Sequence, residues 1–155
     1  MANPILPAVY RKVYETDFSP YDFSQRVKMQ KLVYLLQEAG ITLGDYNFFW
    51  YKHGPYCQKL QEDILNSVDN NIEINYSENA LQIISTLKEL FFTKTDYNQT
   101  QWVECLASLH YLFSNVFSYD VEPSEIIAKL EKIKPHLNNT KVNNYAFQKI
   151  KEIFK

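Results

Sequence analysis

The chain is poor in glycine, and the three that it has, Gly40, Gly44 and Gly54, lie close together. A loop that wraps a phosphate needs several closely spaced glycines ahead of a helix, and neither G-x-G-x-x-G nor G-x-x-x-x-G-K-[ST] occurs. The common nucleotide-binding motifs are therefore missing from the sequence. The backbone conformations that only glycine adopts easily are confined to one region.

Cysteine is also scarce, with only Cys57 and Cys105 present. They are far apart, form no Cys-x-x-Cys pair and have no histidine nearby at the spacing of a metal ligand. This predicts neither a disulfide framework nor a zinc site, and reduced thiols are the expectation for a cytoplasmic protein. We expect no metal and no cofactor.

Neither sign of charge dominates, because 16 basic and 18 acidic residues are interspersed and give a formal net charge of -2. This balance argues against a strongly basic nucleic-acid binder and an acidic tail, although it leaves room for a local basic patch. No stretch reaches the roughly 18 apolar residues of a membrane span, and the N-terminus lacks the features of a secretory signal. We expect a cytoplasmic protein with no membrane partner.

What the chain does have is apolar material, at 46% hydrophobic and 15% aromatic residues, which suffices for one core in 155 residues. We predict a single, mainly α domain over residues 1–155 with a small β element (α+β). Helical periodicity predicts a short helix from Leu6 to Tyr14 and several C-terminal helices over residues 78–154. Ser77, Pro123 and Thr140 are the expected starts of three of these helices.

The segment Phe23–Ala39 predicts a helix that is apolar on two opposite sides. One side carries Met29, Leu32, Val33, Leu35, Leu36 and Ala39, and the other carries Phe23, Val27 and Tyr34. A helix of this kind is expected to be buried at the centre of a domain, so we predict that the others pack around it. Lys28, at the margin of the larger apolar side, must extend outward or meet a partner, because an unpaired buried charge is costly. Gly40 is expected to end the helix.

Aromatic residues then predict a strand over Tyr46–Tyr51 that is covered on both faces. Lys52–Pro55 is expected to form a turn, with Pro55 in the first turn of a helix that runs to about Val68. Ile72–Tyr76 alternates apolar and polar residues, which predicts a strand with one solvated face. The two strands would pair into a small sheet, and a winged-helix-like arrangement is one way to combine that sheet with the helices.

No catalytic constellation accompanies these elements. A Cys57/His53 pair would straddle the Gly-Pro turn without a third orienting group, and no G-x-S-x-G elbow occurs. His110 is interpreted as a partly buried, hydrogen-bonded side chain and His136 as a cation at a helix end. The adjacent acids Glu62 and Asp63 do not face each other on a helix. We therefore expect no catalytic residues and a protein that is not an enzyme.

Two blocks of sequence, VKMQKLVYLLQ and FFWYKHGPYCQKLQED, resemble the K-x-Q-K-L-x-Y … F-x-x-Y-x-x-G-P-Y-S-x-x-L pattern of the Panacea antitoxin domain and of related YwgA-like and SocA-like phage-associated proteins. The matching positions are Lys28, Gln30, Lys31, Leu32 and Tyr34 in the first block, and Phe48, Tyr51, Gly54, Pro55, Tyr56 and Leu60 in the second. The resemblance covers residues 22–64. Cys57 departs from it, because serine is common there.

The resemblance implies a non-enzymatic module of bacterial, phage and mobile-element proteins. Such a module often acts as an antitoxin that binds and neutralises a toxin encoded nearby, and some relatives are adaptors that deliver a partner protein to other machinery. A structural role accounts for part of the pattern, since Gly54 permits a tight reversal and the tyrosines pack. We assign that structural role to Gln30, Leu32, Tyr34, Tyr51, Gly54 and Pro55.

For contact with a partner protein, the candidates are Lys28, Lys31, Lys52, His53 and Tyr56. The alternative function is a winged-helix-like DNA-binding regulator, because Arg26, Lys28 and Lys31 give the central helix a basic edge. Nucleic acid is not favoured as a partner, since a recognition helix must expose one face to a groove and this helix is needed for the core.

Overall fold

The computed structural model of the chain describes residues 3–69, 71–118 and 120–154. The helices are α1 (Ile5–Tyr14), α2 (Phe23–Glu38), α3 (Gln58–Leu65), α4 (Glu78–Phe91), α5 (Gln99–Asn115), α6 (Pro123–Ile133) and α7 (Thr140–Ile153). Two short strands, β1 (Phe49–Tyr51) and β2 (Gly54–Tyr56), pair antiparallel. The prediction of a mainly α protein with a small β element is confirmed.

Local capping signals fix where several helices begin. The carboxylate of Asp22 accepts a hydrogen bond from the backbone N–H of Gln25 at the start of α2, and the Ser77 hydroxyl accepts one from Ala80 at the start of α4. Each bond satisfies a backbone donor that the first turn leaves free. The predicted start at Ser77 is therefore confirmed, whereas the cap of α7 is Asn139 and not Thr140.

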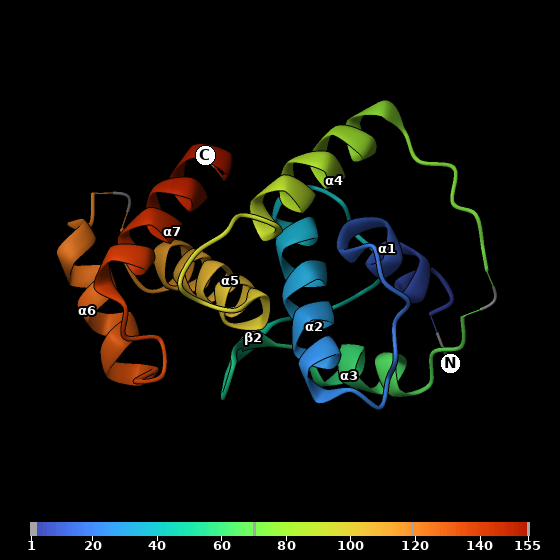
Figure 1. The fold of residues 1–155 in the computed structure, drawn as a ribbon, viewed down its shortest axis with the longest axis horizontal. Coiled ribbons are helices and arrows are strands. Elements are labelled where there is room, and N and C mark those ends of the chain that lie inside the picture. Colours follow the sequence, from blue (N-terminus) through green and yellow to red (C-terminus); the bar gives the residue numbers. More distant parts are fainter. Residues whose placement is uncertain (1–2, 70, 119, 155) are drawn as a thin grey trace.

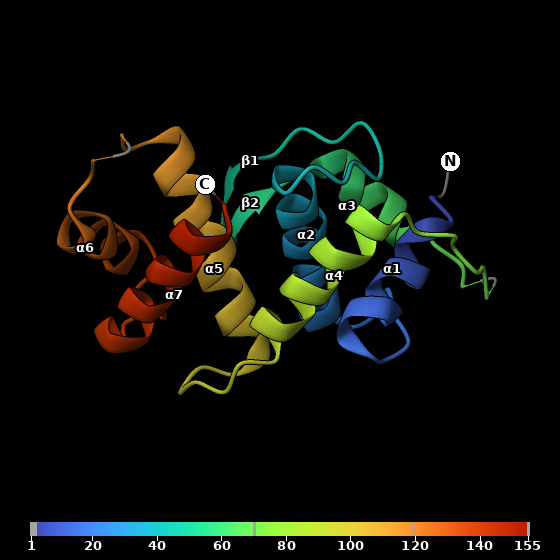
Figure 2. The ribbon, with the colours of Figure 1, turned by 90° about the horizontal axis from the view of Figure 1, so that it is seen from above.

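Helix α2 runs through the middle of the molecule (Figures 1 and 2). Its most extensive packing is against α5, and it also contacts α1, α3 and β2. Leu32, Leu35 and Leu36 are completely buried. Helices α1 and α3 lie on one side of α2, while α6 and α7 lie on the other, beyond α5 (Figures 1 and 2). The prediction of a central buried helix is confirmed.

Helix α5 is the second axis of the core. It carries a continuous buried run from Trp102 to His110, and it contacts α6 and α7 on one side and α2 and β2 on the other. The helices of the C-terminal half therefore reach the hairpin and α2 mainly through α5. None of the helices in the described part of the chain combines the length and hydrophobicity that crossing a bilayer requires.

The β element differs from the predicted one. The chain reverses at once after β1, so Tyr51 pairs with Gly54 and Phe49 with Tyr56. Gly54 has φ +95°, a conformation that L side chains rarely adopt, and this permits the tight reversal. Pro55 therefore lies in β2 and does not start the next helix, which begins at Gln58 with Cys57 as its cap.

Two further predictions about strands were wrong. Ile72–Tyr76 is not a strand, and this segment instead lies beside α1, where Ile72, Ile74 and Tyr76 line a hollow with residues of that helix. The aromatic strand is not covered on both faces either. Phe49 is 67% exposed and Tyr51 52% exposed, because only the opposite face of the hairpin turns toward the core.

Candidate partner-binding site

Two polar residues of the first sequence block, Gln30 and Lys31, are bonded to the backbone of the second. The side-chain amide of Gln30 donates to the carbonyl oxygen of Cys57 at 2.9 Å, and the Cys57 N–H donates back to Gln30 Oε1 at 3.0 Å. Both residues are buried. The pair closes the end of β2 onto α2 and leaves neither backbone group of Cys57 unsatisfied.

Two buried ammonium groups hold the hairpin from either end of its turn. Lys31 Nζ donates to the carbonyl oxygen of Pro55 at 2.9 Å, and Lys134 Nζ donates to that of Lys52. Lys31 is 1% exposed and Lys134 2% exposed. The hairpin is thus fixed to both α2 and the end of α6, and we expect it to keep its shape when it meets a partner.

Behind the hairpin lies one buried carboxylate, that of Glu104 on α5. Its oxygens lie 3.5 Å from Lys134 Nζ, 2.9 Å from His136 Nε2 and 3.8 Å from His53 Nδ1. Burial lowers the pKa of Lys31 to about 7 and lowers the pKa values of Lys134 and His53 from their ordinary values, while the Glu104 charge acts in the opposite direction. The charge of this single carboxylate therefore offsets only part of the effect of burial on these groups.

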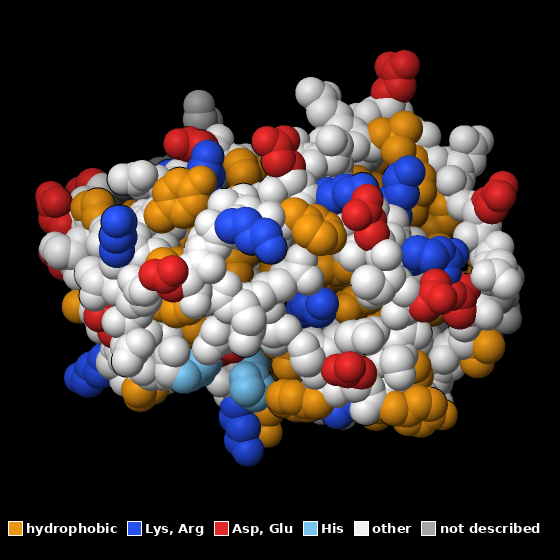
Figure 3. Space-filling model, viewed as in Figure 1, with side chains coloured by type: hydrophobic (Ala, Val, Ile, Leu, Met, Phe, Trp, Pro, Cys, Tyr) orange, Lys and Arg blue, Asp and Glu red, His pale blue; other side chains and the backbone are white. Residues whose placement is uncertain are grey.

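Figure 3 shows exposed histidine side chains close to one another on the face of the molecule that it views, beside a Lys or Arg side chain. His53 and His136 both keep more than two fifths of the side chain exposed, at 41% and 45%. His136 is therefore not simply a cation at a helix end, because its Nε2 is held by Glu104.

Tyr34 of α2 and His110 of α5 form a separate buried pair. The Tyr34 hydroxyl lies 2.7 Å from His110 Nδ1. Burial lowers the pKa of His110 to about 4, so the imidazole is neutral at pH 7. The interpretation of His110 as a buried, hydrogen-bonded side chain is confirmed. Tyr34 and Leu32 are buried, as the structural role predicted for them requires.

Most of the residues predicted to contact a partner meet at one pocket of about 410 Å³, the hairpin pocket. It is lined by Phe23, Arg26, Val27, Gln30, Lys31, Tyr51, Lys52, His53, Tyr56 and Gln61. Lys31, Lys52, His53 and Tyr56 are therefore together. Lys28 is not among them, because its ammonium donates to Gln99 Oε1 at 3.2 Å and lies 4.7 Å from the centre of the Tyr14 ring.

Two assignments need correction in this light. Lys31 was expected on a basic edge of the central helix, but the hairpin covers this position and buries the side chain. Tyr51 was assigned a structural role, yet it is half exposed, and its ring contacts Tyr56, with ring centres 5.0 Å apart, and the ammonium of Lys52. A partner can contact Lys31 only from within the pocket, whereas Tyr51 is half exposed at the surface.

Sequence reasoning missed Glu104 and Lys134 and considered Arg26 only for DNA binding. Glu104 interrupts the run WVECLASL, in which almost every other side chain is apolar. A charged residue inside such a run is rarely buried without a partner, so the pattern could have indicated that Glu104 is buried and paired. Lys134 directly precedes Pro135 and gave no comparable signal.

The geometry offers little for catalysis. The Cys57 sulfur is buried and accepts the backbone N–H of Leu60 at 3.4 Å as a helix cap, while His53 faces Glu104. Cys57 and His53 therefore have other partners. In the described part of the chain, no three His, Cys, Asp or Glu side chains are grouped to hold a metal ion.

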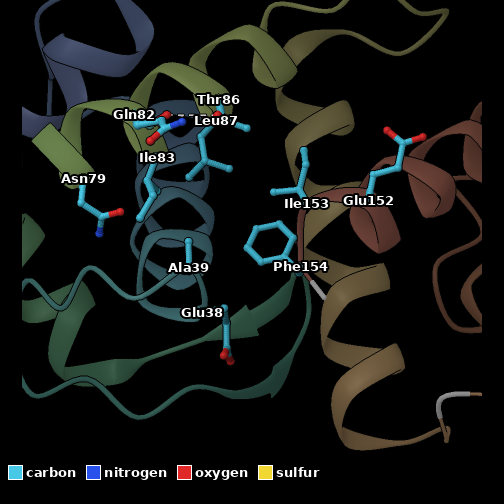
Figure 4. Close-up of a pocket in the computed structure, with 10 residues that line it drawn as sticks. All are labelled: Glu38, Ala39, Asn79, Gln82, Ile83, Thr86, Leu87, Glu152, Ile153 and Phe154. Carbon is cyan, nitrogen blue, oxygen red and sulfur yellow. Dashed lines mark hydrogen bonds between the residues drawn. The ribbon is translucent and has the colours of Figure 1, made fainter.

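A larger pocket of about 530 Å³ lies between the C-terminal end of α2, the side of α4 and the end of α7 (Figure 4). Figure 4 shows Ile83, Ile153 and Phe154 around it, with carboxylates at Glu38 and Glu152. None of the predicted partner-binding residues lines this pocket.

Compared with models of protein families, with curated proteins and with solved structures, the chain gives no match.

Proposed function

We propose that the chain is a non-enzymatic binding module that recognises a partner protein with the surface around its β-hairpin. This hairpin surface consists of Phe23, Phe49, Tyr51, Lys52, His53 and Tyr56. The resemblance of residues 22–64 to antitoxin domains makes a toxin encoded nearby the first partner to test, and an adaptor role is the other form of the same activity.

The observation that carries the proposal is the exposure of large aromatic side chains on a rigid support. Phe49 and Tyr51 are alternate residues of β1 and so point to the same face, and Phe23 at the start of α2 is 56% exposed. Exposed aromatic clusters of this kind mark contact surfaces, and aromatic residues are enriched among those that dominate binding energy.

The support beneath these side chains favours binding as well. The hairpin backbone is bonded to the buried side chains of Gln30, Lys31 and Lys134. A surface that is already ordered loses less conformational entropy when it binds. The aromatic side chains therefore need no rearrangement of the backbone to meet a partner.

The alternative of a DNA-binding regulator is less well supported. Arg26 is half-buried and donates to the Pro20 carbonyl, and Lys31 is buried under the hairpin. The basic edge on which that alternative depends is therefore not a free face of α2, and a recognition helix needs one.

The proposal is tested by co-purifying the chain with the product of the neighbouring reading frame. Phe49→Ala together with Tyr51→Ala should abolish capture and, for an antitoxin, abolish protection of cells that express the partner. Phe92→Ala with Tyr145→Ala is the matched control, because these aromatics are also exposed but lie at the end of α4 and on α7.

The proposal is contradicted if the hairpin variant still captures the partner and the control variant does not. The contact surface would then lie elsewhere on the chain. If no complex forms and the chain instead retards DNA in an electrophoretic shift assay, with retention that weakens steeply with salt, the DNA-binding alternative replaces this proposal.

A further inference from the structure

We propose that the hairpin pocket binds a carboxylate from an acidic segment of the partner protein. This inference rests on the proposed function and extends it, because it names the chemistry that the partner must present. The aromatic side chains outside the pocket would contact the segment around that carboxylate.

The charge of the lining residues is the first observation. Arg26, Lys31 and Lys52 all line the pocket together with His53, and no aspartate or glutamate is among its ten lining residues. Glu104, the buried acid behind the hairpin, faces Lys134, His136 and His53. A net positive concavity with apolar walls attracts and retains an anion.

The position of Lys31 is the second observation. Its ammonium is almost completely buried, and among the described residues its hydrogen bond is to the carbonyl of Pro55. An ammonium group has three donors. No carboxylate of the described residues lies within 4.0 Å of this one, so a bound carboxylate would give the buried amine a close partner and favour its charged form.

Arg26 supplies a further donor at the wall of the pocket. One end of its guanidinium donates to the Pro20 carbonyl at 2.8 Å, while the Nε is buried and has no hydrogen-bond partner among the described residues. The guanidinium also lies 5.5 Å from the ring centre of Phe23, which helps to fix its plane. A guanidinium held in this way is suited to a planar carboxylate.

The remaining walls indicate a polypeptide and not a nucleic-acid backbone. Phe23, Val27, Tyr51 and Tyr56 contribute apolar surface, which suits the methylene groups of an acidic residue and an apolar neighbour. A phosphate backbone is usually bound by a row of exposed cations. Here Lys52 is exposed, while Arg26 is half-buried and Lys31 buried, so the three basic groups form no row of exposed cations.

The test uses the full ¹⁵N-labelled chain and two short capped peptides, Ac-Gly-Glu-Phe-Glu-Gly-NH₂ and its glutamine counterpart Ac-Gly-Gln-Phe-Gln-Gly-NH₂. The acidic peptide should shift the amide signals of the lining residues, from Arg26 to Lys31 and from Tyr51 to Tyr56. The glutamine peptide should bind about tenfold more weakly, as expected for the loss of a charge-assisted hydrogen bond.

Variants then connect the binding to the pocket. Arg26→Gln and Lys52→Gln each should weaken the acidic peptide several-fold without changing the remainder of the spectrum. Lys129→Gln, at an exposed position on α6, should leave the affinity unchanged. These surface and half-buried positions are chosen over Lys31, because removing a buried ammonium also removes its bond to the hairpin.

Equal binding of the two peptides, or shifts confined to residues outside the pocket, would overturn the inference. So would a DNA duplex that shifts the same signals more strongly than the acidic peptide does. The two proposals fail separately: a partner that is captured equally well by Arg26→Gln and Lys52→Gln refutes the carboxylate pocket alone. Acidic peptide binding without any captured protein refutes only the proposed function.

Discussion

The side-chain amide of Gln30 and the backbone of Cys57 form a reciprocal pair of hydrogen bonds, at 2.9 Å and 3.0 Å. Gln30 thus takes the place of a neighbouring strand at the point where β2 ends and α3 begins. Glutamine suits this task because its amide carries a donor and an acceptor side by side. This contact joins the two sequence blocks, since Gln30 lies in the first and Cys57 in the second.

Gln30→Leu is expected to destabilise the fold. It leaves the buried N–H of Cys57 without a partner, whereas the Cys57 carbonyl still accepts the N–H of Gln61 at 3.0 Å. A loss of about 1–3 kcal/mol is therefore predicted for the one unsatisfied group. The free energy of unfolding in urea measures it. Gln148→Leu, at an exposed position on α7, should change that free energy by less than about 0.5 kcal/mol. Equal effects at the two positions would mean that the pair contributes nothing.

Gly54→Ala tests a close approach between the hairpin and α5, that of Gly54 to Ser108. An added Cβ would lie 2.5 Å from Ser108 Oγ, and the backbone at Gly54 has φ +95°. We expect a loss of about 2–4 kcal/mol from the clash and the strained backbone together. The Ser108 hydroxyl is buried without a partner among the described residues, so Ser108→Ala alone should be neutral or slightly stabilising.

The double variant Gly54→Ala with Ser108→Ala separates the two causes. It should recover the part of the loss that comes from the clash and retain about 1 kcal/mol or more from the positive φ. Complete recovery would show that the backbone conformation costs nothing, and no recovery would show that the methyl group never meets the hydroxyl. Thermal and urea unfolding of the four proteins in this cycle provide the comparison.

The central helix could be predicted from the sequence because its evidence is local. The apolar residues of α2 repeat with helical period, Asp22 caps its first turn, and Gly40 follows its end with φ +105°. The hairpin could not be predicted in the same way. Pro55 is a strong local signal for a helix start, but the carbonyls of Pro55 and Cys57 are bonded to side chains 24 and 27 residues earlier in the chain.

The alternation of apolar and polar residues in Ile72–Tyr76 does reflect which side chains are buried, but the predicted strand is absent from this segment. It arises because an extended segment lies against α1 with Ile74 and Tyr76 partly buried on the core, not because a strand pairs with it. For the site, residue types such as Lys52 and His53 were identified from the sequence, whereas the burial of Lys31 depends on the hairpin that covers it. A helical-wheel projection places a residue on a face but does not show what covers that face.

The buried ammonium of Lys31 predicts how stability changes with pH. Its pKa falls from 10.5 when unfolded to about 7 in the folded chain, so between these values the unfolded state binds more protons. Stability should therefore rise with pH in this window, by up to about 1.4 kcal/mol per pH unit. Between pH 7 and pH 9, the free energy of unfolding in urea should increase more for wild type than for Lys31→Met. Groups that titrate alike in both proteins contribute equally and cancel in the comparison. A difference in unfolding free energy between the two proteins that is the same at pH 7 and pH 9 would contradict the prediction.

Glu104→Gln tests whether the buried charges act as a unit. It keeps the size of the side chain but removes the one buried carboxylate beside Lys134, which leaves an uncompensated buried cation at a cost of about 3–5 kcal/mol. Adding Lys134→Met should recover part of this loss, although the bond from Lys134 to the Lys52 carbonyl is then lost as well. Glu73→Gln, at an exposed position, should be neutral within about 0.5 kcal/mol in the same urea experiment. If Glu104→Gln behaves like that control, the buried cations do not depend on the carboxylate, and the fixed hairpin must owe its position to Gln30 and Lys31.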